Sequence, residues 1–393
     1  MVHTITTEER RRRVATRHRL ATAVRTDSVL EIAESLIALH SSDPATVHLS
    51  AATRMTNPSI KAVEDALYEE RTIVRHHAMR RTIWVMPVPH ARRAHATTTE
   101  KIAANERKRT LKAIEASTDI ADPETWFADA RQEVIALLNA KGSLTTREVG
   151  QALPHLAVPV EFGSEKHSAT LNAHTKVLQG AGFDGDVVRG RPPGSWVSSE
   201  YPWSATTTWL GESITGMDKP TAAAELVEAW LRSFGPGTVT DLVWWFGDTK
   251  TLIRNALADL GAVEVSLEDG TAAWVAAGDV ADTEQPDPWV RLLPGLDPTS
   301  MGWKERDWYI EADYLDPMFD RFGNIGPAVW ADGRIVGGWA QRDDASVLVE
   351  LFEPLSKMQQ RLLDDAIEQM HSIVDGVCVK PRFPARMQKV LLS

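Results

Sequence analysis

The segment from residue 221 to residue 275 constrains the fold most, because three helical runs are followed by two alternating runs joined through Asp-Gly. The helical runs are residues 222–233, 240–246 and 250–260, and the alternating runs are residues 262–267 and 271–275. Thr240 is placed to cap the second helix, and Thr249 or Asp248 to cap the third. Asp269-Gly270 between alternating runs is a strong hairpin signal. Three helices followed by a hairpin is the order of a winged helix-turn-helix, which this segment therefore predicts.

The same order of elements occurs twice earlier in the chain. One set has helices over residues 123–140, from residue 142 onward and over residues 165–180, then two strands within residues 182–197. A looser set has helices near residues 28–39, 44–55 and 58–69, then extended segments at residues 72–77 and 82–87. Both sets predict further winged-helix modules, and the lack of a fixed period argues against a solenoid.

Beyond residue 287 the pattern changes to short apolar strands with a tight turn at Asp332-Gly333 and one amphipathic helix over residues 359–370. The predicted fold class is therefore α+β, with tandem winged helix-turn-helix modules followed by a small β-rich, barrel-like C-terminal domain. The predicted domains are residues 1–120, 121–212 and 213–280 for the three modules and residues 288–393 for the C-terminal domain. A chain of 393 residues has room for several such modules.

Composition excludes several classes of protein. No apolar run approaches the roughly 20 residues that a membrane span requires. The arginine cluster at residues 10–13 is not followed by the apolar stretch of a secretory signal. Since Cys378 is the one cysteine, an intrachain disulfide and a zinc finger are excluded. We therefore expect a cytoplasmic protein, associated with the nucleoid if it binds DNA.

No metal and no cofactor are expected. Adjacent histidines at His76 and His77 face opposite sides of a strand, and the spacing of His90 and His95 is unsuited to joint ligation on a helix. No segment matches a phosphate-binding loop or a dinucleotide fingerprint. The net charge of −11 argues against simple electrostatic binding of nucleic acid. However, arginines gather near the N-terminus and in residues 75–93, so a local basic face is expected.

Four polar side chains, His40-Ser41-Ser42-Asp43, stand between an apolar helical run and a new helix, where core residues would be expected. Asp43 followed by Pro44 is typical of an N-cap with proline at the first helical position. His40 and Ser42 are therefore expected at the mouth between two helices. There they would be held rigidly and still reach a ligand.

Two motifs connect this chain to a known family. Residues 292–298 (LLPGLDP) and 332–339 (DGRIVGGW), following tandem winged helices, resemble the winged-helix DNA glycosylases of the AlkZ and YcaQ type. The resemblance covers nearly the whole chain. It implies excision of alkylated or crosslinked purines from double-stranded DNA, without a metal or cofactor.

The resemblance also implies site residues. In characterised members the polar turn carries a glutamine, then an apolar or small residue, then a glutamine or aspartate. These two polar positions fall on His40 and Ser42 here, so neither is retained. Residues 79–84 resemble the family strand whose arginine and threonine side chains face the DNA, which places Arg80, Arg81 and Thr82 in that role.

The polar turn has residues suited to breaking an N-glycosidic bond. Hydrolysis passes through an oxocarbenium-like state, so the protein supplies a negative neighbour and a positioned water. His40 is expected to orient or deprotonate that water with a pKa near neutrality, Ser42 to hold it, and Asp43 to stabilise positive charge on the sugar. The plainer alternatives are that Asp43 is only an N-cap, that His40 satisfies a carbonyl at a helix C-terminus, and that the serines form a turn.

Basic residues supply the expected DNA contacts. The predicted DNA-binding residues are Arg54, Arg75, His77, Arg80, Arg81, Thr82, Lys304 and Arg306. On a strand, cations interspersed with apolar residues would present one side to phosphate. The alternatives are a solvated surface for the strand and a surface salt-bridge network for residues 304–307. Of Trp244 and Trp245, only one can be an exposed stacking platform, because neighbours on a helix face different ways.

Two functional classes follow. The first is a monofunctional DNA glycosylase, acting as a monomer, with water positioned by the turn at His40 and Ser42. The second is a non-catalytic winged-helix DNA-binding or regulatory protein that has lost the glutamines of the glycosylases. Release of base from alkylated DNA separates the two.

Overall fold

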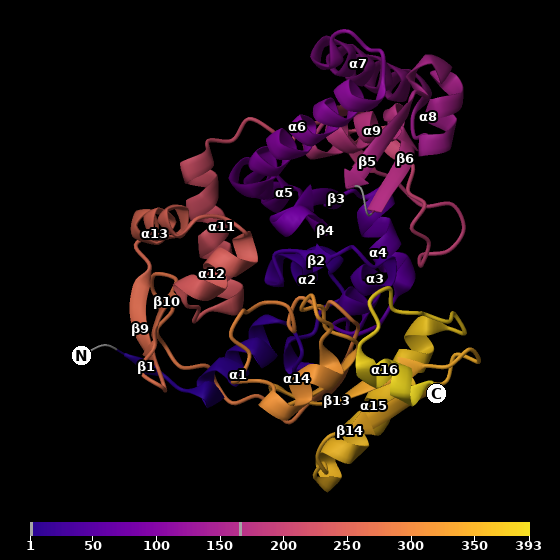
Figure 1. Ribbon diagram of the computed structural model, residues 1–393. Helices are drawn as coiled ribbons and strands as arrows, with labels where there is room; N and C mark the ends of the chain where they lie inside the picture. Colours follow the sequence, from indigo (N-terminus) through magenta and orange to yellow (C-terminus); the bar gives the residue numbers. More distant parts are fainter. Residues whose placement is uncertain (1–2, 165–166) are drawn as a thin grey trace.

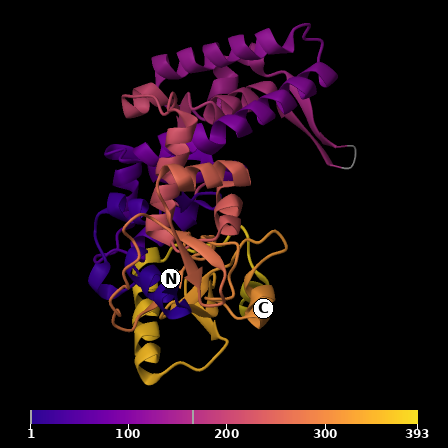
Figure 2. The same ribbon diagram turned by 90° about the vertical axis from the view of Figure 1, so that its left-hand side faces the viewer.

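The structure, a computed structural model, describes residues 3–164 and 167–393 and has the predicted mixed α+β character. Helices from the middle of the chain gather at one end, the C-terminal sheet lies at the other, and the N-terminal region lies between them (Figures 1 and 2). None of the helices in the described ranges combines the length and apolarity that a membrane crossing requires.

The N-terminal region builds a small sheet between helices. Its elements are β1 (Thr4–Ile5), α1 (Thr7–Arg17), α2 (Val29–Ser35), β2 (Leu39–His40), α3 (Pro44–Ala52), α4 (Ile60–Glu64), β3 (Ile73–Ala78) and β4 (Thr82–Pro87). The predicted extended segments correspond to β3 and β4, which form an antiparallel sheet with β2 in the order β2-β4-β3. The helix predicted near residues 28–39 was too long, because Ile37 takes a positive φ of 64° and the chain then joins the sheet.

The second region forms the helical end of the molecule. Its elements are α5 (Val88–Ala94), α6 (Glu100–Ser117), α7 (Pro123–Lys141), α8 (Thr146–Ala152), β5 (Pro159–Ser164), β6 (His167–Asn172), α9 (Ala173–Phe183), β7 (Val187–Arg189), β8 (Trp203–Ala205) and α10 (Thr206–Leu210). The helix predicted over residues 165–180 was wrong in its first half. Residues 167–172 pair with β5 as a hairpin, and residues 165–166 lie outside the described ranges. The partner of β7 lies at residues 203–205, beyond the predicted segment, so a long connection joins β7 to β8.

The third region has the predicted three helices and hairpin. Its elements are α11 (Lys219–Phe234), α12 (Val239–Phe246), α13 (Lys250–Asp259), β9 (Val263–Leu267) and β10 (Ala272–Val275). Thr249 caps α13 as expected, whereas α12 is capped by Thr238 in a capping box with Asp241 rather than by Thr240. The N-terminal β1 pairs in parallel with β9 and extends the hairpin to three strands.

The C-terminal region is a sheet with a covering helix. Its elements are β11 (Val290–Leu293), α14 (Ala312–Met318), β12 (Ala328–Ala331), β13 (Arg334–Gln341), β14 (Val347–Leu351), α15 (Lys357–Val374) and α16 (Arg386–Leu391). Leu363 and Met370 of α15 pack on the sheet against Trp339, which confirms the predicted covering helix. The expectation of a barrel-like domain was wrong, because within the described residues the four antiparallel strands form an open sheet ordered β11-β12-β13-β14.

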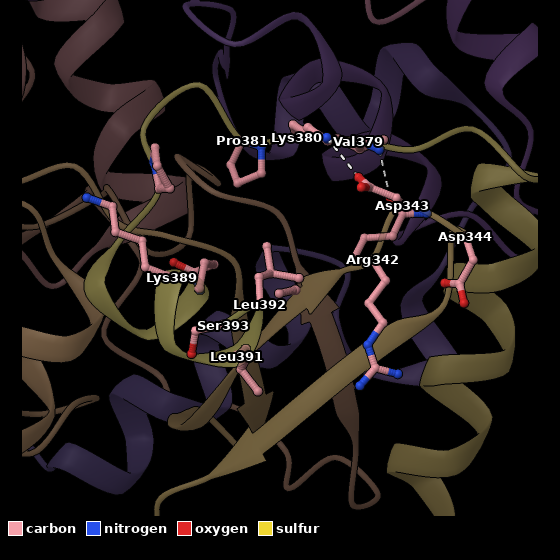
Figure 3. A pocket seen from close by; sticks show the side chains of 14 residues that line it. Arg342, Asp343, Asp344, Val379, Lys380, Pro381, Lys389, Leu391, Leu392 and Ser393 are labelled. Atoms are coloured by element: carbon pink, nitrogen blue, oxygen red, sulfur yellow. Dashed lines mark hydrogen bonds and ion pairs between the residues drawn. The ribbon is translucent and has the colours of Figure 1, made fainter.

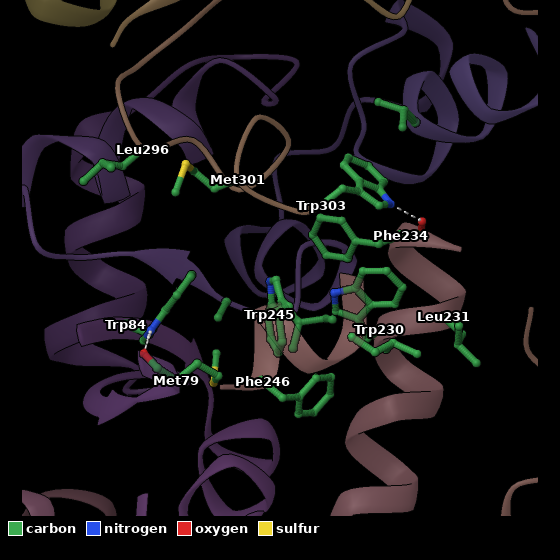
Figure 4. Close-up of a cluster of buried hydrophobic side chains, with 14 of the residues drawn as sticks. Met79, Trp84, Trp230, Leu231, Phe234, Trp245, Phe246, Leu296, Met301 and Trp303 are labelled. Carbon is green, nitrogen blue, oxygen red and sulfur yellow. Dashed lines mark hydrogen bonds between the residues drawn. The ribbon is translucent and has the colours of Figure 1, made fainter. Parts of the chain in front are cut away.

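One large core joins all four of these regions. Trp84 of β4, Trp230 and Trp245 of the third region, and Trp303 of the C-terminal region are buried in the same cluster (Figure 4). Ring centroids of Trp84 and Trp245 are 6.0 Å apart. Large aromatic side chains contribute much of the apolar area that a core buries. Trp84 of β4 packs in this core and pairs with His40 of β2, so the core also holds His40 in place.

Candidate functional site

The polar turn is held by a strand on one side and a helix on the other. His40 pairs with Trp84 across β2 and β4, so it does not lie at a helix C-terminus as one alternative supposed. Asp43 is the N-cap of α3 and Pro44 its first residue, as predicted. The turn therefore has two rigid supports and fixed geometry.

His40 is a neutral histidine with one free nitrogen. Its side chain is 4% exposed, and its ring centroid lies 4.5 Å from that of Trp84. Burial, reinforced by the charge of Arg80, lowers its pKa to about 3, so the expected pKa near neutrality was wrong. Its Nδ1 accepts a hydrogen bond of 3.3 Å from the Ser42 backbone N–H. A neutral imidazole that accepts at Nδ1 carries its hydrogen on Nε2, so His40 offers a donor there rather than a base.

Ser42 and Asp43 differ in how many hydrogen bonds their side chains form. The Ser42 side chain is half-buried, and its Oγ forms no hydrogen bond within the described part of the chain. Asp43 accepts from the backbone N–H of Ala45 at 3.1 Å and from that of Arg382 at 2.8 Å. Burial raises the Asp43 pKa, while these two N–H donors oppose that rise. Ser42 is thus free to hold a water, whereas Asp43 caps α3 and holds the C-terminal segment against it.

Arg54 is not placed to contact DNA, contrary to the sequence prediction. Its side chain is 0% exposed and donates to both carboxylate oxygens of Asp297, at 2.9 and 2.8 Å. It also donates to Thr299 Oγ1 at 2.7 Å. Since Asp297 belongs to the LLPGLDP motif, this buried pair fastens α3 to the C-terminal region.

Arg75 and His77 are also buried, so the prediction that they face phosphate from the strand surface was wrong. Arg75 Nε donates to Ser41 Oγ at 2.8 Å, which places this arginine directly behind the polar turn. The His77 ring lies 4.2 Å from that of Phe183 in α9, and burial lowers its pKa to about 3. The predicted strand face is covered because α9 and β7 pack on β3.

Arg80 and Arg306 both approach half-buried Trp244, and Arg306 also lies 4.4 Å from the Phe319 ring centroid. The guanidinium of Arg80 lies 4.2 Å from the ring centroid of Trp244, and that of Arg306 lies 5.4 Å from it. Neither arginine forms an ion pair, and neither Nε has a partner, among residues 3–164 and 167–393. Burial and the neighbouring Arg306 lower the Arg80 pKa to about 10. We call these three residues the Arg80–Trp244–Arg306 cluster. Trp245 is buried, so only Trp244 is available as a platform, as predicted.

The remaining predicted residues lie beside this cluster. Thr82 Oγ1 donates to the Met79 carbonyl at 2.9 Å and closes the turn between β3 and β4. Arg81 is exposed and pairs with Glu106 at 3.0 Å. The Lys304 side chain is exposed and forms no ion pair in the part of the chain that the structure describes, so the alternative of a salt-bridge network at residues 304–307 is not observed.

Helix α6 carries basic residues that the sequence analysis did not single out. Lys108, Arg109 and Lys112 line an open hollow of about 450 Å³ together with Arg81. In the sequence they form a charge run that is typical of any solvated helix. Only the approach of α6 to the β3–β4 turn places them beside the Arg80–Trp244–Arg306 cluster.

A cavity of about 910 Å³ lies at the C-terminal end of the chain (Figure 3). It is lined by the end of β13, the segment after α15, and α16. Lys380 in its wall is paired with Asp343 at 2.8 Å. None of the predicted site residues lines this cavity.

His76 of β3 lies next to His95, which follows α5 in the chain. His76 Nε2 lies 3.2 Å from His95 Nδ1, and both rings are buried. Across the described ranges, no group of three or more His, Cys, Asp or Glu side chains is arranged to hold a metal ion.

Comparisons with known proteins identify related chains. A family model described as DNA glycosylase AlkZ-like matches residues 33–373. An interstrand DNA cross-link repair glycosylase from Streptomyces sahachiroi is 27% identical over 221 residues, which is 54% of this chain and 57% of that protein. The structure of Streptomyces sahachiroi DNA glycosylase AlkZ matches 95% of this chain and 98% of its own with a TM-score of 0.72, at 18% identity. The sequence match thus spans little more than half of the curated relative, and the structural match shows the shared fold.

Proposed function

This chain belongs to the AlkZ-like DNA glycosylase family, and on that basis we propose that it hydrolyses the N-glycosidic bond of alkylated or crosslinked purines in double-stranded DNA. The observation that carries the proposal is the position of His40. Its free Nε2–H lies at a rigid turn, and its ring lies within the electrostatic reach of Arg80, a cation with no ion pair in the described residues. The repeated order of helices and hairpins supports tandem winged helices as the modules that hold the duplex.

The chemistry fits a donor rather than a base at His40. A purine made cationic by alkylation is already a good leaving group, so bond breaking needs stabilisation of the sugar cation and a positioned water. Ser42 Oγ holds that water, His40 Nε2–H orients it or the departing base, and the negative charge of Asp43 lies next to them. The attacking water gives its proton to solvent after its oxygen has bonded to the highly reactive sugar cation, so a strong base is unnecessary.

DNA binding is assigned to the Arg80–Trp244–Arg306 cluster, extended by Arg81, Lys304 and the basic residues of α6. These groups supply positive charge and one aromatic face near His40, as a duplex with its phosphates requires. Because one chain carries all of these residues, we propose that the protein acts as a monomer. We also propose that it acts on chromosomal DNA in the cytoplasm, associated with the nucleoid.

The direct test is base release from duplex DNA that contains N7-methylguanine, scored as abasic sites. We expect release by the parent protein and a loss of about a hundredfold in rate for His40→Ala, with a smaller loss for Ser42→Ala. His371→Ala removes an exposed histidine of α15 and serves as the matched control. Binding of the duplex without release of base by the parent protein would instead establish the non-catalytic alternative.

A further inference from the structure

A second group of cations lies on the other side of the polar turn and has no part in the proposed mechanism. It contains two arginines from β3 and β7, two tyrosines, and a histidine of α3, and we call it the Arg75 cluster. Its members are Arg75, Arg189, Tyr68, Tyr201 and His48. The Arg189 and Tyr201 side chains flank the long connection between β7 and β8.

Arg75 is the centre of the cluster. It is 1% exposed, its Nη1 donates to Tyr68 Oη at 3.0 Å, and its guanidinium lies 4.1 Å from the Tyr201 ring centroid. Arg189 stacks on Trp203 at 3.8 Å. Burial, and then the charge of Arg75, lowers the Arg189 pKa to about 10. Arg189 therefore feels the charge of Arg75, whereas Tyr68 and Tyr201 raise the pKa of Arg75 against the effect of its burial.

Among the described residues, no carboxylate pairs with either arginine. Within residues 3–164 and 167–393, neither Arg75 nor Arg189 forms an ion pair, whereas buried Arg54 is fully paired with Asp297. Arg75 Nη2, Arg189 Nε, Tyr201 Oη and His48 Nε2 are buried polar atoms without a partner in the described residues. Buried donors are costly when unpaired, so a cluster that leaves four polar atoms unpaired around two cations is suited to a ligand.

We propose that the Arg75 cluster binds a phosphoryl oxyanion, with Arg189 and Tyr201 as donors and Arg75 as the buried positive charge behind them. A guanidinium group matches the geometry of phosphate oxygens, and a tyrosine hydroxyl adds a further donor. Arg189 and Tyr201 line an open cavity of about 660 Å³, through which such a group enters. Exposed Arg147 adds positive charge there, while Glu148 is engaged by Thr145 and Glu200 is the opposing carboxylate.

The nature of the oxyanion follows from the position of the cluster. Arg75 connects the cluster to the polar turn through its hydrogen bond to Ser41. We therefore assign the oxyanion to a phosphodiester of the DNA strand whose base reaches that turn. That identification rests on the proposed function, whereas the presence of the anion site does not.

Inorganic phosphate tests the site without DNA, against chloride at equal ionic strength, by thermal unfolding. Tyr201→Phe is the informative variant, because the hydroxyl has no partner among the described residues and its removal breaks none of their hydrogen bonds. We expect phosphate to raise the melting temperature of the parent, and Tyr201→Phe and Arg189→Gln each to raise the half-saturating phosphate concentration about tenfold. Arg342→Gln, an exposed arginine at the C-terminal cavity, is the control and keeps parental phosphate binding. Equal stabilisation of all four proteins, or of none, overturns the site.

Binding of undamaged duplex DNA tests the phosphodiester and does not depend on base release. We expect Arg189→Gln to reduce the slope of log affinity against log salt by about one, the effect of one lost phosphate contact. An unchanged slope, with phosphate binding lost, would show that the cluster takes free phosphate and would overturn the phosphodiester assignment. If base release fails but both binding results hold, the anion site stands and the proposed glycosylase activity falls.

Discussion

Arg54 and Arg80, two arginines predicted to touch DNA, each lie beside a buried histidine. The two surroundings differ in how many of their polar atoms have a partner. Arg54 Nε donates to the His18 carbonyl at 2.9 Å, and the charge of Arg80 reaches His40. In both places burial, followed by the neighbouring arginine, lowers the histidine pKa to about 3. Both histidines are therefore buried beside an arginine and kept neutral.

The surroundings of His18 and His40 differ in how many polar atoms have a hydrogen-bond or ion-pair partner. His18 uses both ring nitrogens, with Thr299 Oγ1 at 2.9 Å and the Ser233 carbonyl at 3.1 Å, and Arg54 is neutralised by Asp297. His40 uses Nδ1 alone, and Arg80 has no carboxylate partner among the described residues. A group whose polar atoms all have partners holds the fold together, whereas a group with unpaired polar atoms is available to a ligand. This difference is the reason that we assign Arg54 to the fold and propose Arg80 for ligand binding.

The largest expected effect is the loss of stability on removing Arg54. Arg54→Ala leaves the Asp297 carboxylate buried and unpaired, which we expect to lower the free energy of unfolding by about 3–5 kcal/mol. Urea unfolding followed by tryptophan fluorescence measures the loss. Arg232→Ala removes an exposed ion pair with Glu228 and is the control, with an expected loss below about 1 kcal/mol. A stable Arg54→Ala protein with weakened DNA binding would show that Arg54 faces the ligand after all.

Removing Arg80 or Arg306 should give the opposite pattern. We expect Arg80→Gln and Arg306→Gln each to weaken duplex binding about tenfold near 0.1 M salt while stability is kept, because each loses a phosphate contact but no protein ion pair. Fluorescence anisotropy over a salt series measures both affinity and its salt slope. Arg342→Gln is again the matched control. Parental affinity in both variants would remove the Arg80–Trp244–Arg306 cluster from the interface.

The sequence predicted local features of the site well and distant ones poorly. The Asp43 cap and the hairpin at Gly270 depend on neighbours within a few residues, and both were confirmed. Arg54 was misassigned because its partner Asp297 is 243 residues away. Local pattern carries no information on such a pairing, since burial of a charge is decided by what packs around it. For the same reason the pairing of His40 with β4 was missed, and with it the loss of charge on this histidine.

The pH dependence of stability sharpens the comparison at His40. Its folded pKa of about 3 lies below the ordinary value of 6.5, so the unfolded chain takes up the proton first. Stability from keeping this ring neutral is therefore complete above about pH 6.5 and is lost as the pH falls toward 3, by about 1.4 kcal/mol per pH unit. His40→Gln should reduce the slope over this window by one proton, as measured by urea unfolding between pH 4 and pH 7.

Exposed His371 gives the control for this measurement, because His371→Gln changes a ring that is solvated in both states and should leave the slope as in the parent. An equal slope for His40→Gln and the parent would mean that His40 is solvated in the folded protein. It would then resemble a surface histidine, and the contrast with His18 would be lost.

The smallest expected effect concerns the backbone beside Arg80. Arg80 and Arg81 both have positive φ, 56° and 62°, in the turn between β3 and β4, a conformation that favours glycine. Arg81→Gly and Arg81→Ala lose the same charge and the same exposed pair with Glu106, but only glycine relieves the backbone. We expect Arg81→Gly to be more stable than Arg81→Ala by about 1 kcal/mol and both to bind duplex DNA equally weakly. If the alanine variant were equally stable, the turn would be unstrained; if the difference holds, the turn keeps Arg80 beside His40 at a cost in backbone free energy.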